Sequence, residues 1–174
     1  MDPATVSCPG CGLDLPRGKG VYEGSFHASP ECWSVFCEVL AAEYQDAPLF
    51  GRVHQTTVDT YAVQHAGGRH PDKSVSVHLV GLHLALVRRV PPPEIHPYLR
   101  ALTQAVPEWP HFEPPDVLGA PGRITVLDVA LAGSSADHAA IVRTWATETW
   151  ERWRPHHAAV EALAALAFTS SASR

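Results

Sequence analysis

Residues 53–65, VHQTTVDTYAVQH, constrain the fold more than any other stretch of the chain. Four aliphatic residues with helical spacing alternate there with two histidines, two glutamines, an aspartate and a tyrosine. A helix that served only as core would not bury so many polar side chains, because burial without partners is costly. A helix on the surface would not need the valines. We therefore predict a helix that lines a site.

Length and composition limit the classes of protein to which the chain can belong. Its 174 residues, 45% of them apolar, are enough for one domain with a real core. The formal net charge of −5, with only 13 Lys and Arg, argues against a nucleic-acid partner. No apolar run is long enough to cross a membrane. The N-terminus has no features of a secretory signal, so we expect a cytoplasmic protein whose four cysteines are thiols or metal ligands.

The segment Cys8-Pro9-Gly10-Cys11-Gly12 is a typical knuckle, in which a tight turn directs two thiolates at one metal ion. No strand-helix context of a thioredoxin-like redox motif surrounds it, so structural zinc is the favoured interpretation. One knuckle supplies two ligands, and two more must come from elsewhere in the chain.

The third ligand is predicted at the start of a helix over residues 30–45. Ser29 is a good N-cap and Pro30 fits the first helical position. Cys32 then lies in the first turn, where the helix dipole stabilises a thiolate. Cys37 lies roughly 140° further round the helix. We expect it to face elsewhere, as a buried apolar thiol.

The rest of the chain predicts a mainly α fold, a helical bundle with the N-terminal zinc-knuckle loop packed on one end. Glycine and proline stops divide it into short elements. The tryptophans at 145, 150 and 153 are expected to be core. The predicted parts are a single domain over 1–168 with its zinc loop at 1–30, a loop at 46–53, helices at 54–66, 74–90 and 94–106, a proline-rich loop at 107–122, a strand or helix start at 124–129, a helix from about 134 to 153, a last helix from Pro155, and a disordered tail at 169–174.

Short loops make consecutive helices antiparallel, which brings together the start of the first, the end of the second and the start of the third. Cys32, His65 and His78 should therefore converge, and His65 becomes a candidate fourth ligand. His27 is the alternative, because it lies only five residues before Cys32. His54 is about 16 Å along the helix from His65, too far to share one metal ion with it. Spacing alone leaves the choice between His27 and His65 open.

The strings CPGCG, ASPECW, HQTTVDTYAVQH, SVSVHLVGLHLAL and WERWRPHH resemble an uncharacterised bacterial family of small proteins, a domain of unknown function. The resemblance spans about residues 8–160 and implies no established activity. It implies that His27 is not a shared position, which favours His65 as the fourth ligand. The positions that match the motifs are Cys8, Cys11, Cys32, His54, Asp59, Tyr61, Gln64, His65, His78 and His157.

Two functions fit these observations. The first is a zinc-binding helical protein with a polar pocket, lined by His, Asp and Tyr, for a small molecule or a protein partner. The alternative is a metal-dependent, hydrolase-like enzyme, with catalytic candidates His54, Asp59, Tyr61 and His157. A site of three cysteines and one histidine is usually closed and structural, so the first function is favoured.

Overall fold

The computed structural model describes residues 4–115 and 123–172. Helix α1 (Pro30–Gln45) begins as predicted, with the Ser29 hydroxyl accepting the backbone N–H of Cys32 at 3.2 Å. Helix α2 (Ala47–Gln64) starts earlier than expected, and the predicted loop at 46–53 is wrong. Asp46 both ends α1 and caps α2, where its Oδ1 accepts the Leu49 N–H at 3.0 Å. Pro48 sits in the first turn, where its missing N–H is not needed.

Helix α2 ends at Gln64, before the positive-φ residues Gly67 and Gly68. Helix α3 (Asp72–Leu86) follows and is shorter at its C-terminus than the predicted 74–90, because Arg89 adopts a φ of 55°. The expectation of three consecutive helices is confirmed, although α2 and α3 differ in length from the predicted 54–66 and 74–90.

The C-terminal half is also helical. Helix α4 spans Pro92–Ala105, and α5 spans Val126–Ala130. The ambiguous segment at 124–129 is therefore helical, because Thr125 and Asp128 form a capping box. Part of the predicted loop at 107–122 lies outside the described residues.

Helix α6 spans Ser135–Arg152, as the capping residues predicted. A 3-10 turn, η1 (Arg154–His156), leads into α7 (His157–Ala172), so the last helix begins after Pro155 rather than at it. Helix α7 extends into the stretch expected to be a disordered tail, whose last two residues lie outside the described part. Among the residues that the structure describes, none of the helices combines the length and apolar character needed to cross a membrane.

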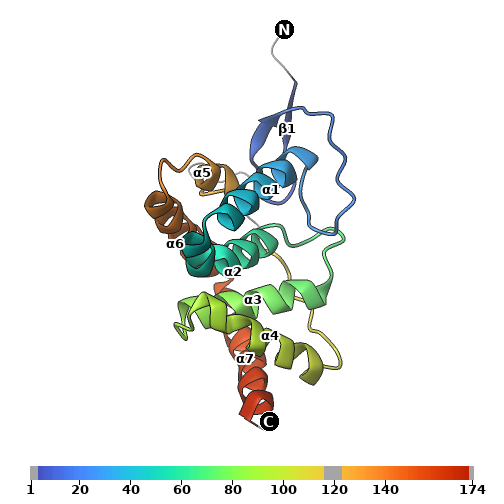
Figure 1. Ribbon diagram of the computed structural model, residues 1–174. Coiled ribbons are helices and arrows are strands. Elements are labelled where there is room, and N and C mark those ends of the chain that lie inside the picture. The colour runs from blue at the N-terminus through green and yellow to red at the C-terminus, as the bar shows by residue number, and fades with distance from the viewer. Residues whose placement is uncertain (1–3, 116–122, 173–174) are drawn as a thin grey trace.

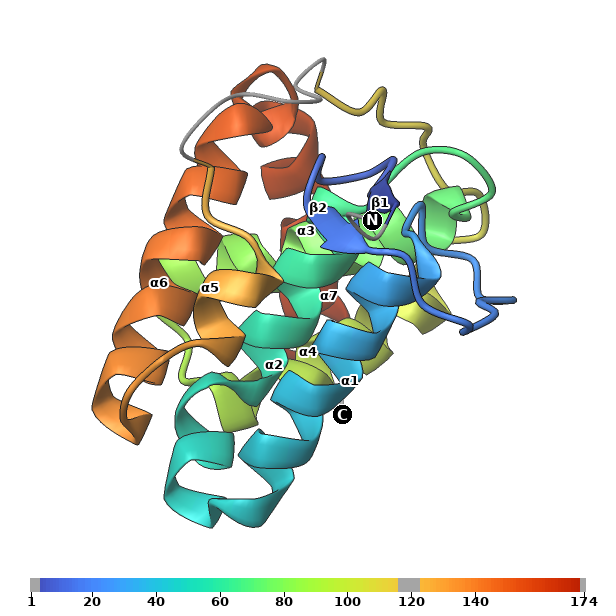
Figure 2. The same cartoon turned by 90° about the horizontal axis from the view of Figure 1, so that it is seen from above.

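The N-terminal loop contains a small ribbon. Strands β1 (Thr5–Ser7) and β2 (Asp14–Pro16) pair antiparallel, with Val6 opposite Leu15, and the knuckle forms their connection. Figure 2 shows this hairpin lying across the start of α1 and the end of α2.

Helix α2 is the centre of the bundle and packs against α1, α3, α4 and α6. Figure 1 shows α1 to α4 as successive layers, with α5 and α6 to one side and α7 against α4. Two apolar clusters lie on either side of α2: Tyr61 belongs to one and Val63 to the other. Trp145 and Trp153 are at most 2% exposed, which confirms the tryptophans as core.

Candidate metal centre

Four side chains from the knuckle, α1 and the end of α2 converge in the interior. The Sγ atoms of Cys8, Cys11 and Cys32 and a ring nitrogen of His65 all lie within 4.8 Å of one another. None of the four residues is more than 3% exposed. This set is close enough together to bind a metal ion, and it contains His65, the fourth residue that topology favoured.

Two distances between ligand atoms match those of a tetrahedral centre. Bonds of about 2.3 Å to sulfur and about 2.0 Å to nitrogen at tetrahedral angles place two sulfurs about 3.8 Å apart, and sulfur and nitrogen about 3.5 Å apart. In the structure Cys11 Sγ lies 3.8 Å from Cys32 Sγ, and His65 Nε2 lies 3.4 Å from Cys32 Sγ. The donor atoms and these two distances therefore fit a tetrahedrally coordinated metal ion.

The knuckle is closed by its own backbone. The Cys8 N–H donates to the Leu13 carbonyl and the Gly12 N–H to the Cys8 carbonyl, both at 2.8 Å. Gly12 has a φ of 74°, a conformation that favours glycine. These bonds turn the chain tightly enough for both thiols to face the same point.

Gly10 allows the knuckle to approach the end of α2. A Cβ on Gly10 would lie 2.3 Å from the His27 carbonyl oxygen and 2.7 Å from His65 Cδ2. No side chain fits in that space. The glycine between the two knuckle cysteines therefore serves the contact with His65.

His65 is oriented by its own helix. Its Nδ1 lies 2.7 Å from the carbonyl oxygen of Tyr61, one turn back. Because a carbonyl only accepts, Nδ1 carries the proton, and Nε2 keeps a lone pair directed at the cysteines. This is the arrangement found around histidines that bind metals.

Tyr61 contacts the same centre, although the sequence suggested it only as a catalytic candidate. Its hydroxyl lies 3.6 Å from Cys32 Sγ, and its ring is stacked between Phe36 at 3.8 Å and His65 at 3.9 Å. Burial, followed by the nearby Cys32, raises the pKa of Tyr61, so the hydroxyl is a hydrogen-bond donor to the sulfur. The spacing of four between Tyr61 and His65 was the available signal for this stacking.

Ionisation of one of these three thiols disfavours ionisation of the other two, because their sulfurs lie close together. Hydrogen bonds from Cys11 and then Cys32 lower the pKa of Cys8, whereas hydrogen bonding with Cys11 and then Cys8 raises the pKa of Cys32. A divalent cation would offset this repulsion and allow all three to be thiolates.

Cys37 is exposed and points away from the cluster, so its expected burial is wrong.

His27, the alternative fourth ligand, contacts His65 through its backbone. Its N–H donates to the His65 carbonyl at 2.9 Å. Its ring lies against Gly68 instead of entering the cysteine cluster.

His78 does not join the cluster either: its Nδ1–H donates to Asp59 Oδ1 at 2.8 Å. Burial raises the pKa of Asp59, against the opposing hydrogen bond from His78.

His54 and His157 belong to separate contacts. His54 donates from Nδ1 to the buried carboxylate of Glu43 at 2.8 Å. His157 donates from Nε2 to the Trp150 carbonyl at 2.9 Å, and its ring stacks on that tryptophan at 3.9 Å. The catalytic candidates thus do not form one constellation. The role of Glu43 was not foreseen, since a single glutamate in an amphipathic helix carries no signal of burial.

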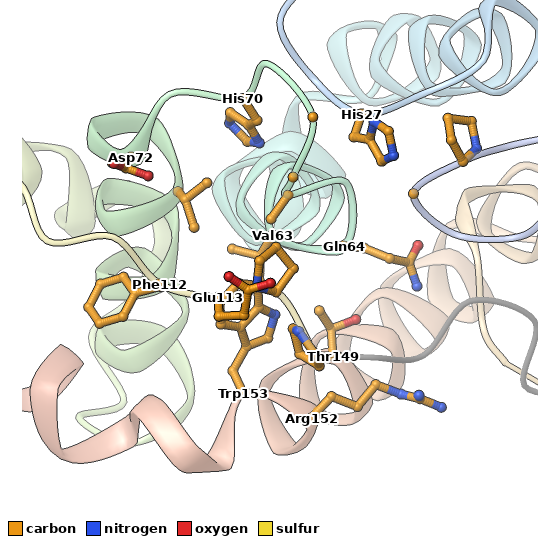
Figure 3. Close-up of a pocket in the computed structure, with 18 of the residues that line it drawn as sticks. His27, Val63, Gln64, His70, Asp72, Phe112, Glu113, Thr149, Arg152 and Trp153 are labelled. Carbon is orange, nitrogen blue, oxygen red and sulfur yellow. The ribbon is translucent and has the colours of Figure 1, made fainter.

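A pocket of about 700 Å³ opens beside the metal centre, between the end of α2, the start of α3, residues 111–115 and the end of α6. Figure 3 shows His27 and His70 on one side, Thr149 and Arg152 on the other, and Glu113 between them. His54, Asp59, Tyr61 and His157 are not among its lining residues, so the expectation that polar residues of the central helix line the pocket is met only by Gln64. The lining also includes Pro9, Gly10, Val63, Asp72, His111, Phe112, Arg123 and Trp153.

The fold and this centre define a mainly helical protein with a buried cluster of three cysteines and one histidine that can hold a metal ion. The chain belongs to the family of unknown function DUF5946, whose model matches residues 6–154. The matched part includes the four clustered residues and all helices from α1 to α6. Searches of curated proteins and of solved structures found no match.

Proposed function

We propose that the protein binds one zinc ion through Cys8, Cys11, Cys32 and His65, and that this zinc is structural. The observation that carries the proposal is the mutual distance of at most 4.8 Å among four buried ligand atoms. Three thiolates and one imidazole in tetrahedral spacing are the ligands that zinc prefers in closed sites. The thiols must stay reduced, which fits the cytoplasmic location that the sequence predicts.

The zinc would fasten the N-terminal loop to the helical bundle. Between β2 and α1 the chain has no helix or strand, and its residues are mostly exposed or half-buried. Such a segment buries too little apolar surface to order itself. Two ligands before this segment, one after it and one on α2 would hold it in place.

A closed centre with four protein ligands leaves no position for a water molecule, which disfavours hydrolysis at this metal. The pocket supports the second part of the proposal, the binding of a small molecule. Its lining combines the apolar Val63, Phe112 and Trp153 with polar side chains, a mixture typical of such sites.

The zinc assignment is tested by measuring the metal content of protein purified without chelator, for the parent and two matched pairs of variants. Cys32→Ser should lose zinc, whereas Cys37→Ser, a change at the exposed cysteine, should retain one equivalent. His65→Ala should weaken binding, whereas His27→Ala should not. Cobalt substituted into the parent should show the absorption of a tetrahedral thiolate site.

Parent protein without metal, or with a Cys8–Cys11 disulfide, would overturn the proposal. Loss of zinc in His27→Ala but not in His65→Ala would assign the fourth ligand to the local histidine instead.

A further inference from the structure

The metal centre and the pocket share one wall. Pro9 and Gly10, the two residues between the knuckle cysteines, line the pocket. Gln64, which lies next to His65 in the chain, lines it as well. The same backbone therefore presents ligands on one side and a pocket surface on the other.

Hydrogen bonds at His65 extend this wall. Its carbonyl accepts the backbone N–H of His27 at 2.9 Å and the Nδ1–H of His70 at 3.1 Å. His70 Nε2 in turn accepts the Ser74 hydroxyl at 2.8 Å. Both imidazoles line the pocket (Figure 3). The position of His65 thus sets the positions of two pocket residues.

The opposite walls do not depend on the knuckle. The His111 side chain donates to Asp72 at 2.7 Å, and His156 donates to the Glu113 carbonyl at 2.9 Å. Trp153 is held in the core at the end of α6. Removal of the knuckle would therefore open one side of the pocket and leave the aromatic rings of its lining in place.

The side chains around the pocket indicate what it accepts. Phe112 and Trp153 are the two aromatic rings other than histidine in the lining, and rings of this kind suit a flat apolar group. Arg152 lies on the side of the pocket near α6, away from Asp72 (Figure 3), and Arg123 is close enough to Arg152 for their charges to interact. Arg152 also pairs with Glu148 at 3.3 Å, which restrains its guanidinium. A carboxylate on the ligand would be attracted to this side.

We propose that the pocket binds a flat aromatic carboxylate and that this binding is coupled to the metal centre, because the metal holds the shared wall in place. The inference rests on the proposed zinc site and adds its role: the ion completes a ligand site. Coupling between two sites is reciprocal, so each ligand must raise the affinity of the other by the same factor.

The test uses naphthoate, a fluorescent aromatic carboxylate, as the probe. Its dissociation constant is measured for the zinc-loaded protein and for protein stripped by a chelator. Zinc affinity is then measured by chelator competition with and without saturating naphthoate. We expect naphthoate to bind the zinc form at least about tenfold more tightly, and naphthoate to raise zinc affinity by the same factor.

Two further variants are measured in the zinc-loaded protein, so that unfolding of the stripped protein cannot produce the result. Pro9→Trp, at an exposed knuckle position, should change naphthoate affinity by about fivefold or more in protein shown by metal analysis to hold one equivalent of zinc. Arg152→Ala should weaken naphthoate binding, whereas Arg143→Ala, on the exposed face of α6, should not.

Equal naphthoate affinity with and without zinc, no effect of Pro9→Trp, or no binding to either form would each overturn the inference. In those cases zinc would still be bound through its four ligands, and the proposed metal centre would stand. If the parent holds no zinc, the proposed function itself fails.

Discussion

Replacing Gly10 by alanine isolates the contact between the knuckle and His65. The backbone of Gly10 does not have a positive φ, so alanine introduces no conformational strain there. The added methyl group would instead meet the His27 carbonyl at 2.3 Å and the His65 ring at 2.7 Å. Neither neighbour is the free end of a flexible side chain, so the knuckle itself must move away from His27 and His65.

The size of this displacement determines how much zinc affinity is lost. Ordinary contact of a Cβ begins near 3.4 Å, so the knuckle must move by about 1 Å from the carbonyl and by about 0.7 Å from the ring. Metal sites hold their ligands to within about 0.2 Å. The displaced centre would keep either its knuckle thiolates or His65 in good geometry, but not both. Loss of an orienting partner alone weakens metal binding by about 10- to 100-fold, and we expect Gly10→Ala to reach at least the upper value.

Zinc affinity of Gly10→Ala is measured by competition with a chromophoric chelator, and the ligand set by the absorption of the cobalt form. Gly20→Ala in the same loop is the matched control, because its nearest neighbour is a Pro30 carbon at 3.7 Å. A Gly10→Ala protein with the zinc affinity and cobalt spectrum of the parent would refute the steric argument and the tight approach on which it rests.

Three other substitutions test the surroundings of the centre. Tyr61→Phe keeps the ring stacking but removes the hydroxyl near Cys32, and should weaken zinc binding by about tenfold in the same competition assay. Gly51→Ala, which meets no atom within 4 Å, should raise the free energy of unfolding by about 0.5–1 kcal/mol in urea titrations and leave zinc binding unchanged. Burial raises the pKa of Asp59 above its ordinary 3.8, so its stabilising contribution is present below that value and is lost as the pH rises. Asp59→Asn should therefore gain stability relative to the parent as the pH increases above about 4, and thermal unfolding curves that differ equally at every pH would contradict this.

Much of the metal centre could be predicted because its determinants are local. A CxxC turn fixes two thiols, and the residues before Cys32 cap a helix whose first turn presents the third. The antiparallel course of α1 and α2 then brings His65 to the same end, although the length of α2 was wrong. Because α2 has 18 residues and α1 has 16, with Asp46 between them, the end of α2 returns to the start of α1, and His65 still reaches the site.

The pocket could not be predicted in the same way. Its surfaces come from the knuckle, two helix ends and residues 111–115, which are far apart in the sequence. The apolar period of a helix indicates which face is buried, but it does not indicate whether that face meets a cavity or another helix. His111 and Glu113 stand in a segment without periodicity, where only the tertiary structure gives them neighbours.

The sequence suggested that the polar residues of α2 line a site. In the structure His54 and Asp59 form contacts between helices instead. Buried polar groups need partners, and here the partners come from adjacent helices. Glu43 on α1 accepts hydrogen bonds from His54 at 2.8 Å and from His138 on α6 at 3.0 Å, so one carboxylate joins three helices. Asp59 joins α2 to His78 of α3 in the same manner. Replacing one of these histidines by a residue that cannot donate would take a donor from a buried carboxylate, at a cost of about 1–3 kcal/mol or more. The polar residues His54 and Asp59 of α2 are therefore accounted for by hydrogen bonds that hold neighbouring helices together.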